Sequence, residues 1–341
     1  MIPSDLRITS RAIRRQPILA GISLLGLAVG MASFILIALF VREELRFDRF
    51  HEHADRIVRV TSHYEDETGI RSFARSYPAI GPAISNEFSE VVSAVRLQRW
   101  TGPVRYEDRR FNEQEMFMVD PSFFEVFTFP LVQGDPRDVF GGAGSVAITE
   151  STARRYFGDA DPLGKTLVMA DTVFLEVMGV VSDPPPYSHI RFSILMSMDL
   201  LRDRWAVAGN DLDATWTAGT FYTYLLMSSP GIQPDHDGRL AQFVERHVGD
   251  QKVTGVQYSL QFQPLTDIHL KSDLRQEMGP NGSQSTIIVF LFIAGLVLVI
   301  SVINFINFAT AHPSLRIASQ ILGINVMYYT LKYVRRRVRD E

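Results

Sequence analysis

Two long runs of apolar residues stand near the two ends of the sequence, at 17–41 and 279–315, and the second is densest at 286–311. A helix needs about 20 residues to cross the ~30 Å hydrocarbon layer of a membrane. We therefore predict transmembrane helices over 17–41 and 285–311. A secretory signal peptide is the alternative for the first run. The apolar part of such a peptide is usually only about 7 to 15 residues long, which favours an uncleaved anchor.

Between the two runs, shorter apolar segments alternate with turn residues, which indicates a folded domain over 42–284. Runs of β-branched and aromatic residues predict strands, and apolar residues three or four apart predict short helices. The predicted strands cover 56–64, 91–97, 145–149, 172–181, 192–198, 221–227 and 257–262, and the predicted helices cover 78–88, 121–127, 150–157 and 234–248. This order indicates an α+β fold with a mixed sheet and short helices, not a regular βαβ winding.

Local turn chemistry sharpens two of these boundaries. Thr149 and Ser151 are hydroxyl residues at the start of the helix predicted over 150–157, and Gly158 is placed to end it. The three consecutive prolines at 184–186 enforce an extended link between two strands. We expect this link to separate two subdomains.

Basic residues flank both apolar runs on the terminal side. Because cytoplasmic flanks carry the excess of Lys and Arg, both termini are predicted to be cytoplasmic and the central domain to lie outside. The segment 1–16 is interpreted either as an amphipathic helix on the inner membrane face or as a simple positive flank, and the tail 312–341 as a basic cytoplasmic segment that favours anionic lipid. The candidate membrane-face anchors are Arg7, Arg11, Arg14, Arg15, Arg335, Arg336 and Arg337.

Small and polar residues inside the two runs are candidates for helix packing. Gly26 and Gly30 form a G-x-x-x-G step, which lets two helix backbones approach closely. Asn304 and Asn307 are three apart and share a helix face, where an amide in hydrocarbon needs a polar partner. For Asn307, a position at the membrane interface facing water is the alternative.

The charge balance argues against nucleic-acid binding. Outside the two basic flanks the chain carries 24 Lys and Arg against 35 Asp and Glu, a charge of about −11. The sequence contains no cysteine, so the outer domain is expected to be stable without disulfides.

No motif in the sequence indicates catalysis, a metal or a cofactor. The tripeptide at 164–166, Gly-Lys-Thr, resembles part of a P-loop, but it lies in the wrong register and runs from a helix into a strand. His51 and His53 are two apart and are interpreted as a solvated turn, the other histidines are scattered, and the acidic pair Asp211 and Asp213 is interpreted as surface charge. An enzyme is therefore not expected.

Six segments together resemble one known family, the MacB/FtsX-like permeases of ABC transporters that carry a MacB-like periplasmic core domain. The segments are 25–60, 120–136, 147–166, 177–197, 263–274 and 279–311. The resemblance implies a bacterial inner-membrane protein with a periplasmic central domain. It also implies a separate ATP-binding subunit as partner, whose nucleotide-driven helix movement is passed to that domain to export or extract a substrate.

Further partners implied by the resemblance are a second permease half or a second copy of the chain, membrane lipid and periplasmic proteins. The family continues after the second span with a cytoplasmic segment and two further spans, whereas 312–341 bears little likeness to it, so a truncated permease half is expected. The alternatives are a two-pass extracytoplasmic sensor or binding protein, a non-functional permease remnant and, with the least support, an extracytoplasmic enzyme.

Overall fold

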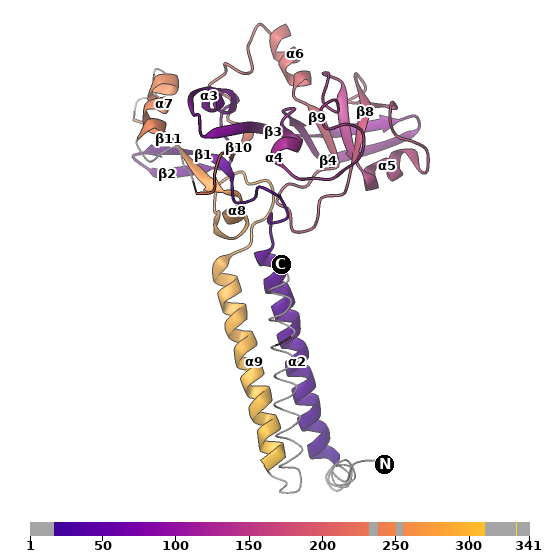
Figure 1. The fold of residues 1–341 in the computed structure, drawn as a ribbon, viewed down its shortest axis with the longest axis vertical. Coiled ribbons are helices and arrows are strands. Elements are labelled where there is room, and N and C mark those ends of the chain that lie inside the picture. Colours follow the sequence, from indigo (N-terminus) through magenta and orange to yellow (C-terminus); the bar gives the residue numbers. More distant parts are fainter. Residues whose placement is uncertain (1–16, 232–237, 250–254, 311–331, 333–341) are drawn as a thin grey trace. The chain divides into compact units, whose positions relative to one another are not determined.

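The computed structural model describes residues 17–231, 238–249, 255–310 and 332, which form parts of two compact units. The membrane unit comprises Met1–Leu45 and Gln284–Glu341, and the outer domain comprises Arg46–Ser283. The membrane unit contains two long helices, α2 (Pro17–Leu45) and α9 (Gln284–Thr310) (Figure 1).

Both long helices are apolar enough to span a membrane, over Leu25–Leu45 and Gln284–Ile306. Large apolar side chains such as Leu36 and Phe292 stand exposed on them. A water-soluble protein would leave such a surface uncovered at a large cost, whereas hydrocarbon solvates it. Helix α2 runs four residues past the predicted end at 41.

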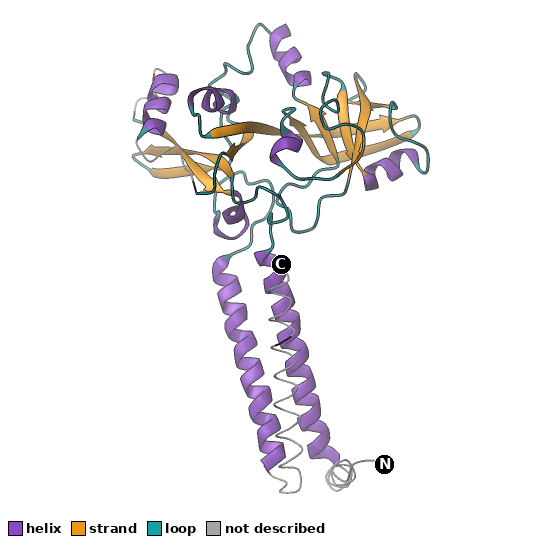
Figure 2. Cartoon of the chain, viewed as in Figure 1, coloured by secondary structure: helices purple, strands orange, loops and turns teal. Residues whose placement is uncertain are grey.

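The described strands of the outer domain form one mixed sheet of eleven strands. Figure 2 shows the strands with the helices around them. The main path of the sheet has the order β11-β1-β10-β3-β4-β9-β6-β8-β5, with β2 beside β1, and β7 beside β3 and β8. Two pairs, β4 with β9 and β6 with β8, are parallel and the remaining pairs are antiparallel. The strands are β1 (Ile57–Asp66), β2 (Gly69–Phe73), β3 (Val91–Tyr106), β4 (Arg109–Val119), β5 (Leu131–Gln133), β6 (Ser145–Thr149), β7 (Thr166–Met169), β8 (Val173–Val181), β9 (Ile194–Ser197), β10 (Phe221–Met227) and β11 (Gln257–Pro264).

Short helices connect these strands and cover the sheet. They are α3 (Ile80–Glu87), α4 (Phe123–Val126), α5 (Glu150–Phe157), α6 (Asp199–Val207), α7 (Arg239–Val248) and α8 (Leu265–Lys271). The predicted boundaries of α5 are confirmed, because the Thr149 side chain accepts a hydrogen bond from the N–H of Thr152 at its start and Gly158 ends it with φ +66°.

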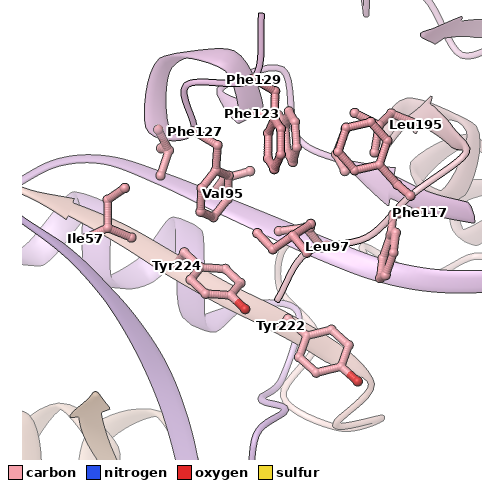
Figure 3. Close-up of a cluster of buried hydrophobic side chains, with 14 of the residues drawn as sticks. Ile57, Val95, Leu97, Phe117, Phe123, Phe127, Phe129, Leu195, Tyr222 and Tyr224 are labelled. Carbon is pink, nitrogen blue, oxygen red and sulfur yellow. The ribbon is translucent and has the colours of Figure 1, made fainter. Parts of the chain in front are cut away.

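Strand β10 shows how the sheet is buried on both faces. All seven of its residues are buried, and successive side chains point to opposite faces of the sheet. Tyr222 and Tyr224 enter a central aromatic core (Figure 3). Leu226 belongs to the same core, whereas Leu225 and Met227 enter a second core under α3 and α7 and Phe221 enters a third. A third core lies between α5 and strands β4 and β6 to β9. The sixteen-residue strand β3 runs through the sheet from β10 to β7, so the cores lie along one continuous sheet. The expectation that the proline link at 184–186 separates two subdomains is wrong, because the strands it joins, β8 and β9, both pair with β6 and share the third core.

Candidate functional site

The chain that follows α2 forms a turn in which Asp48 and His51 are buried in the outer domain. Asp48 lies three residues after the end of α2 and has no exposed surface. Its backbone adopts φ +59°, a conformation that Asp and Asn tolerate better than most residues. Its N–H donates to the carbonyl of Tyr187 at 2.9 Å, in the proline-rich link between β8 and β9. A segment next to the membrane helix is thereby tied to a loop about 140 residues away.

The Asp48 carboxylate holds His189 in place. One oxygen accepts a hydrogen bond from the His189 N–H at 3.0 Å, and the other lies 2.8 Å from Nδ1, in a contact that is electrostatic rather than a well-aligned hydrogen bond. The Nε2 atom of His189 lies 2.7 Å from the hydroxyl of Tyr224, which is fully buried on β10. A proton on Nδ1 leaves Nε2 as the acceptor for that hydroxyl. This relay connects the turn to a central strand.

The electrostatics favour an ionised Asp48. Burial opposes ionisation, but the favourable electrostatic interaction with the adjacent His189 ring and the hydrogen bond from the His189 backbone N–H hold the pKa of Asp48 below its ordinary value. The second histidine of this region, His51, is only 3% exposed, and burial lowers its pKa to about 4 although Asp48 acts against that shift. His51 is therefore neutral near pH 7.

Aromatic rings enclose His51. Its Nδ1 accepts a hydrogen bond from the N–H of Thr128 at 3.0 Å, and its ring lies 4.0 to 5.2 Å from those of Phe50, Phe127 and Phe129. The interpretation of His51 as part of a solvated turn is wrong, because the ring fills a pocket made by the aromatic segment after α4. His51 and His189 both interact electrostatically with the Asp48 carboxylate.

A second contact fixes the same turn to α8. The rings of Phe47 and His269 stack with centroids 3.4 Å apart and planes 4° apart. We call the set of contacts around this turn the junction cluster. Its members are Phe47, Asp48, Phe50, His51, Tyr187, His189, Tyr224 and His269.

The chain that leads toward α9 is held by a buried ion pair. Arg59 on β1 has a fully buried side chain and bonds both carboxylate oxygens of Glu277 at 2.6 and 2.8 Å, seven residues before α9 begins. Gln263 and Ser272 accept two further hydrogen bonds from Arg59. Arg59 on β1 lies directly opposite Tyr224 on β10. The contacts that run from Asp48 through His189 therefore end on a residue next to the one that binds Glu277.

The same sheet contains a second group of buried charges. Arg96, 1% exposed, makes two hydrogen bonds to the Asp120 carboxylate at 2.8 Å and an ion pair with Asp213 at 2.7 Å. Arg202 bonds the same two acids at 2.9 Å. The interpretation of Asp213 as surface charge is therefore wrong: it anchors the loop between α6 and β10.

In the membrane unit the predicted packing residues of α2 face α9. A Cβ added at Gly26 would lie 2.7 Å from Nδ2 of Asn304, and one added at Gly30 would lie 1.7 Å from Oγ of Ser301. Among the described side chains of α9, the buried positions are Ile287, Ala294 and Ser301, which are spaced by seven residues as in a left-handed coiled coil.

The remaining predicted site residues lie outside the part that the structure describes. Asn307 belongs to α9, but its side chain is not among the described ones. The candidate anchors Arg7, Arg11, Arg14, Arg15, Arg335, Arg336 and Arg337 also lie beyond the described ranges. Within those ranges, no group of three or more His, Asp or Glu is placed to hold a metal ion.

Residues 20–235 match the family model of the MacB-like periplasmic core domain. The chain belongs to this family. The MacB-like core domain is found in ABC transporter permeases, and with two apolar helices beside it, it indicates an inner-membrane protein. No curated protein sequence matches the chain significantly.

Three solved structures are similar to the chain, and the first of them supports the fold. A domain assigned to a permease protein from Porphyromonas gingivalis has a TM-score of 0.55 and 24% identity, covering 63% of this chain and 91% of that one. The periplasmic region of MacB from Actinobacillus actinomycetemcomitans has a TM-score of 0.40 and 16% identity, covering 58% and 87%. The extracellular domain of the ABC-type transporter YknZ from Gram-positive bacteria has a TM-score of 0.38 and 13% identity, covering 58% and 98%.

Proposed function

We propose that this chain is a permease subunit of an inner-membrane ABC transporter that exports or extracts a substrate, with both termini in the cytoplasm. A separate ATP-binding subunit hydrolyses ATP, and the resulting helix movement is passed to the periplasmic MacB-like domain. The basic flanks, including Arg7 to Arg15 and Arg335 to Arg337, contact lipid headgroups on the cytoplasmic face.

In this proposal the junction cluster transmits movement of α2 to the sheet of the outer domain. The observation that carries it is the burial of Asp48 three residues after α2, with both carboxylate oxygens engaged by His189. A flexible linker would absorb a movement of α2, whereas a buried, charged contact transmits it to Tyr224 and the sheet. Transmission over a distance requires such a rigid element.

The first test is to purify the tagged full chain from its host membranes and identify what copurifies. Recovery of an ATP-binding subunit in near-stoichiometric amount supports a working transporter component. If the folded chain is abundant and no ATP-binding subunit is recovered, the transporter proposal fails.

The second test asks whether Asp48 couples nucleotide binding by the partner subunit to the outer domain. In the copurified complex in nanodiscs, hydrogen exchange of the β10 segment and of residues 272–278 is compared with and without an ATP analogue. The variant Asp48→Asn keeps a residue that tolerates positive φ but removes the charge. The matched control is Asp171→Asn, since Asp171 also has φ +61° but is exposed and pairs only with Arg110 among the described contacts.

We expect the nucleotide-dependent change in exchange in the wild-type complex and in Asp171→Asn. In Asp48→Asn the change is lost, while the ATP-binding subunit still binds. A nucleotide response in Asp48→Asn equal to that of the wild type would show that the junction cluster does not transmit the movement.

A further inference from the structure

Strand β11 is a long strand at one end of the sheet. It pairs only with β1 among the described strands, and its eight residues include no charged side chain. Edge strands are normally short, charged or interrupted by proline, because an open edge invites another strand. The strand at the opposite end of the sheet, β5, has three residues. The one proline of β11, Pro264, is its last residue.

The hydrogen-bond register shows which backbone groups of β11 face outward. The N–H of Met227 donates to the carbonyl of Arg56, so the even-numbered residues of β1 turn their backbone groups toward β10 and the odd-numbered ones toward β11. Odd-numbered residues of β1 pair with odd-numbered residues of β11. The backbone N–H and C=O groups that point away from the sheet are therefore those of Tyr258, Leu260 and Phe262.

A groove of about 1130 Å³ runs beside this edge. Five consecutive residues of β11, 257–261, line it, and since neighbouring side chains point to opposite faces, the groove follows the edge of the strand rather than one face. The other wall is α7, which contributes Leu240, Ala241 and Val244. An edge strand that faces a helix across a groove is a form of site that receives an extended peptide.

The acidic side chains that line the groove favour a basic binding partner. Glu65 and Asp66, at the tip of the β1–β2 hairpin, and Glu245 on α7 line it, while no lysine or arginine is among its described lining residues. Asp66 is paired with Arg71, but Glu65 is exposed on the hairpin, and Glu67 follows in the turn. An extended segment whose basic side chains alternate with apolar ones would place the apolar side chains against α7 and the basic ones on the side of Glu65.

We propose that the free edge of β11 binds an extended segment of a periplasmic protein, with alternating basic and apolar residues, as an added strand. The backbone groups of Tyr258, Leu260 and Phe262 supply the hydrogen bonds, the α7 wall supplies apolar contact, and Glu65 with Glu67 supplies the preference for basic residues. This surface is separate from the junction cluster, and its test does not depend on ATP.

The experiment is hydrogen exchange of the full chain in nanodiscs, read at single amides of β11. The probe is a short acetylated and amidated peptide of alternating lysine and valine at about 1 mM, a concentration suited to a weak site. Two control peptides have the same length: one with glutamate in place of lysine, and one N-methylated at every residue, which cannot donate backbone hydrogen bonds.

We expect the lysine peptide to slow exchange at Tyr258, Leu260 and Phe262 roughly tenfold or more, and neither control peptide to do so. The double substitution of Glu65 and Glu67 to Gln should weaken the protection. The matched control is Glu107→Gln, which changes an acid at the tip of a different hairpin, β3–β4.

Three results would overturn the proposal. The first is no protection by the lysine peptide, and the second is equal protection by the glutamate or N-methylated peptide. The third is protection without peptide that grows with protein concentration, because a second copy of the chain would then occupy the edge.

Discussion

Asp48 and His189 make two contacts, one from each carboxylate oxygen, although 140 residues separate them in the chain. One contact holds the His189 backbone and the other holds its ring, so the carboxylate fixes both the position and the orientation of the imidazole. The ring then presents Nε2 to Tyr224. Each of the three groups is buried, and none of their polar contacts can be replaced by water without opening the domain.

We expect the stability of the outer domain to fall as the pH is lowered from about 6.5 to about 4. Burial lowers the pKa of His51 to about 4, so between these values the unfolded chain binds a proton that the folded domain does not. The full difference corresponds to about 3 kcal/mol, at 1.36 kcal/mol for each pKa unit. Below this window, Asp48 adds a further loss as the pH falls through its own lowered pKa.

Chemical denaturation of the full chain in detergent at several pH values measures this slope. His51→Phe should flatten it between pH 6.5 and 4, whereas His53→Gln, which changes a half-exposed neighbour, should retain it. An unchanged slope in His51→Phe would assign the pH dependence to other groups.

Replacing Gly30 with alanine should separate α2 from α9. The added Cβ would lie 1.7 Å from Oγ of Ser301, and two helices cannot keep their distance with such an overlap. Gly21→Ala is the control, since nothing lies within 4 Å of its added Cβ. The double variant Gly30→Ala with Ser301→Gly should restore the packing.

Cross-linking measures this packing in the membrane. The sequence has no cysteine, so cysteines at Phe40 and Phe290, whose rings lie 5.2 Å apart, would be the only pair able to react. With a short bifunctional thiol reagent, we expect the yield of cross-linked protein to fall in Gly30→Ala and to recover in the double variant. Equal yields in all variants would contradict the close approach of the helices at Gly30.

Arg96→Leu should destabilise the outer domain by about 3 to 5 kcal/mol, because it leaves the carboxylates of Asp120 and Asp213 without their buried partner. Arg110→Leu, which removes an exposed pair with Asp171, should cost at most about 1 kcal/mol. Unfolding midpoints of the two variants in denaturant provide the comparison. Similar midpoints would mean that Arg202, which bonds the same acids, replaces Arg96.

The sequence predicted elements where local chemistry decides the structure. β6, β10 and α5 have the predicted bounds, because a short apolar run or a hydroxyl cap with a terminal glycine defines them. β4 was missed, since its first seven residues, RRFNEQE, are mostly polar and its pairing with β3 and β9 decides its conformation. This is tertiary context overriding local pattern.

The junction cluster could not be predicted from spacing. Its members come from the turn after α2, the link between β8 and β9, strand β10 and helix α8, and no periodic pattern connects these segments. His51 and Asp213 were interpreted as solvated because their neighbours in the sequence are polar. The packing of α2 through Gly26 and Gly30 could, by contrast, be predicted from the sequence. The two glycines lie four residues apart, and this spacing alone puts them on one face of the helix.

The pair of Arg59 and Glu277 should position the chain before α9 more than it stabilises the domain. Glu277→Gln leaves the fully buried guanidinium without a counter-charge, so we expect a loss of about 3 to 5 kcal/mol. The double variant Arg59→Met with Glu277→Leu removes both charges, and since apolar residues often replace a buried ion pair at little cost, it should recover most of that stability.

In the double variant, however, residues 272–278 lose the hydrogen bonds of Arg59 to Glu277 and Ser272. Their amide exchange should therefore accelerate while exchange in β6 and β8 stays unchanged. A double variant that is as unstable as Glu277→Gln would instead identify the pair as a source of net stability, and unchanged exchange at 272–278 would remove its positioning role.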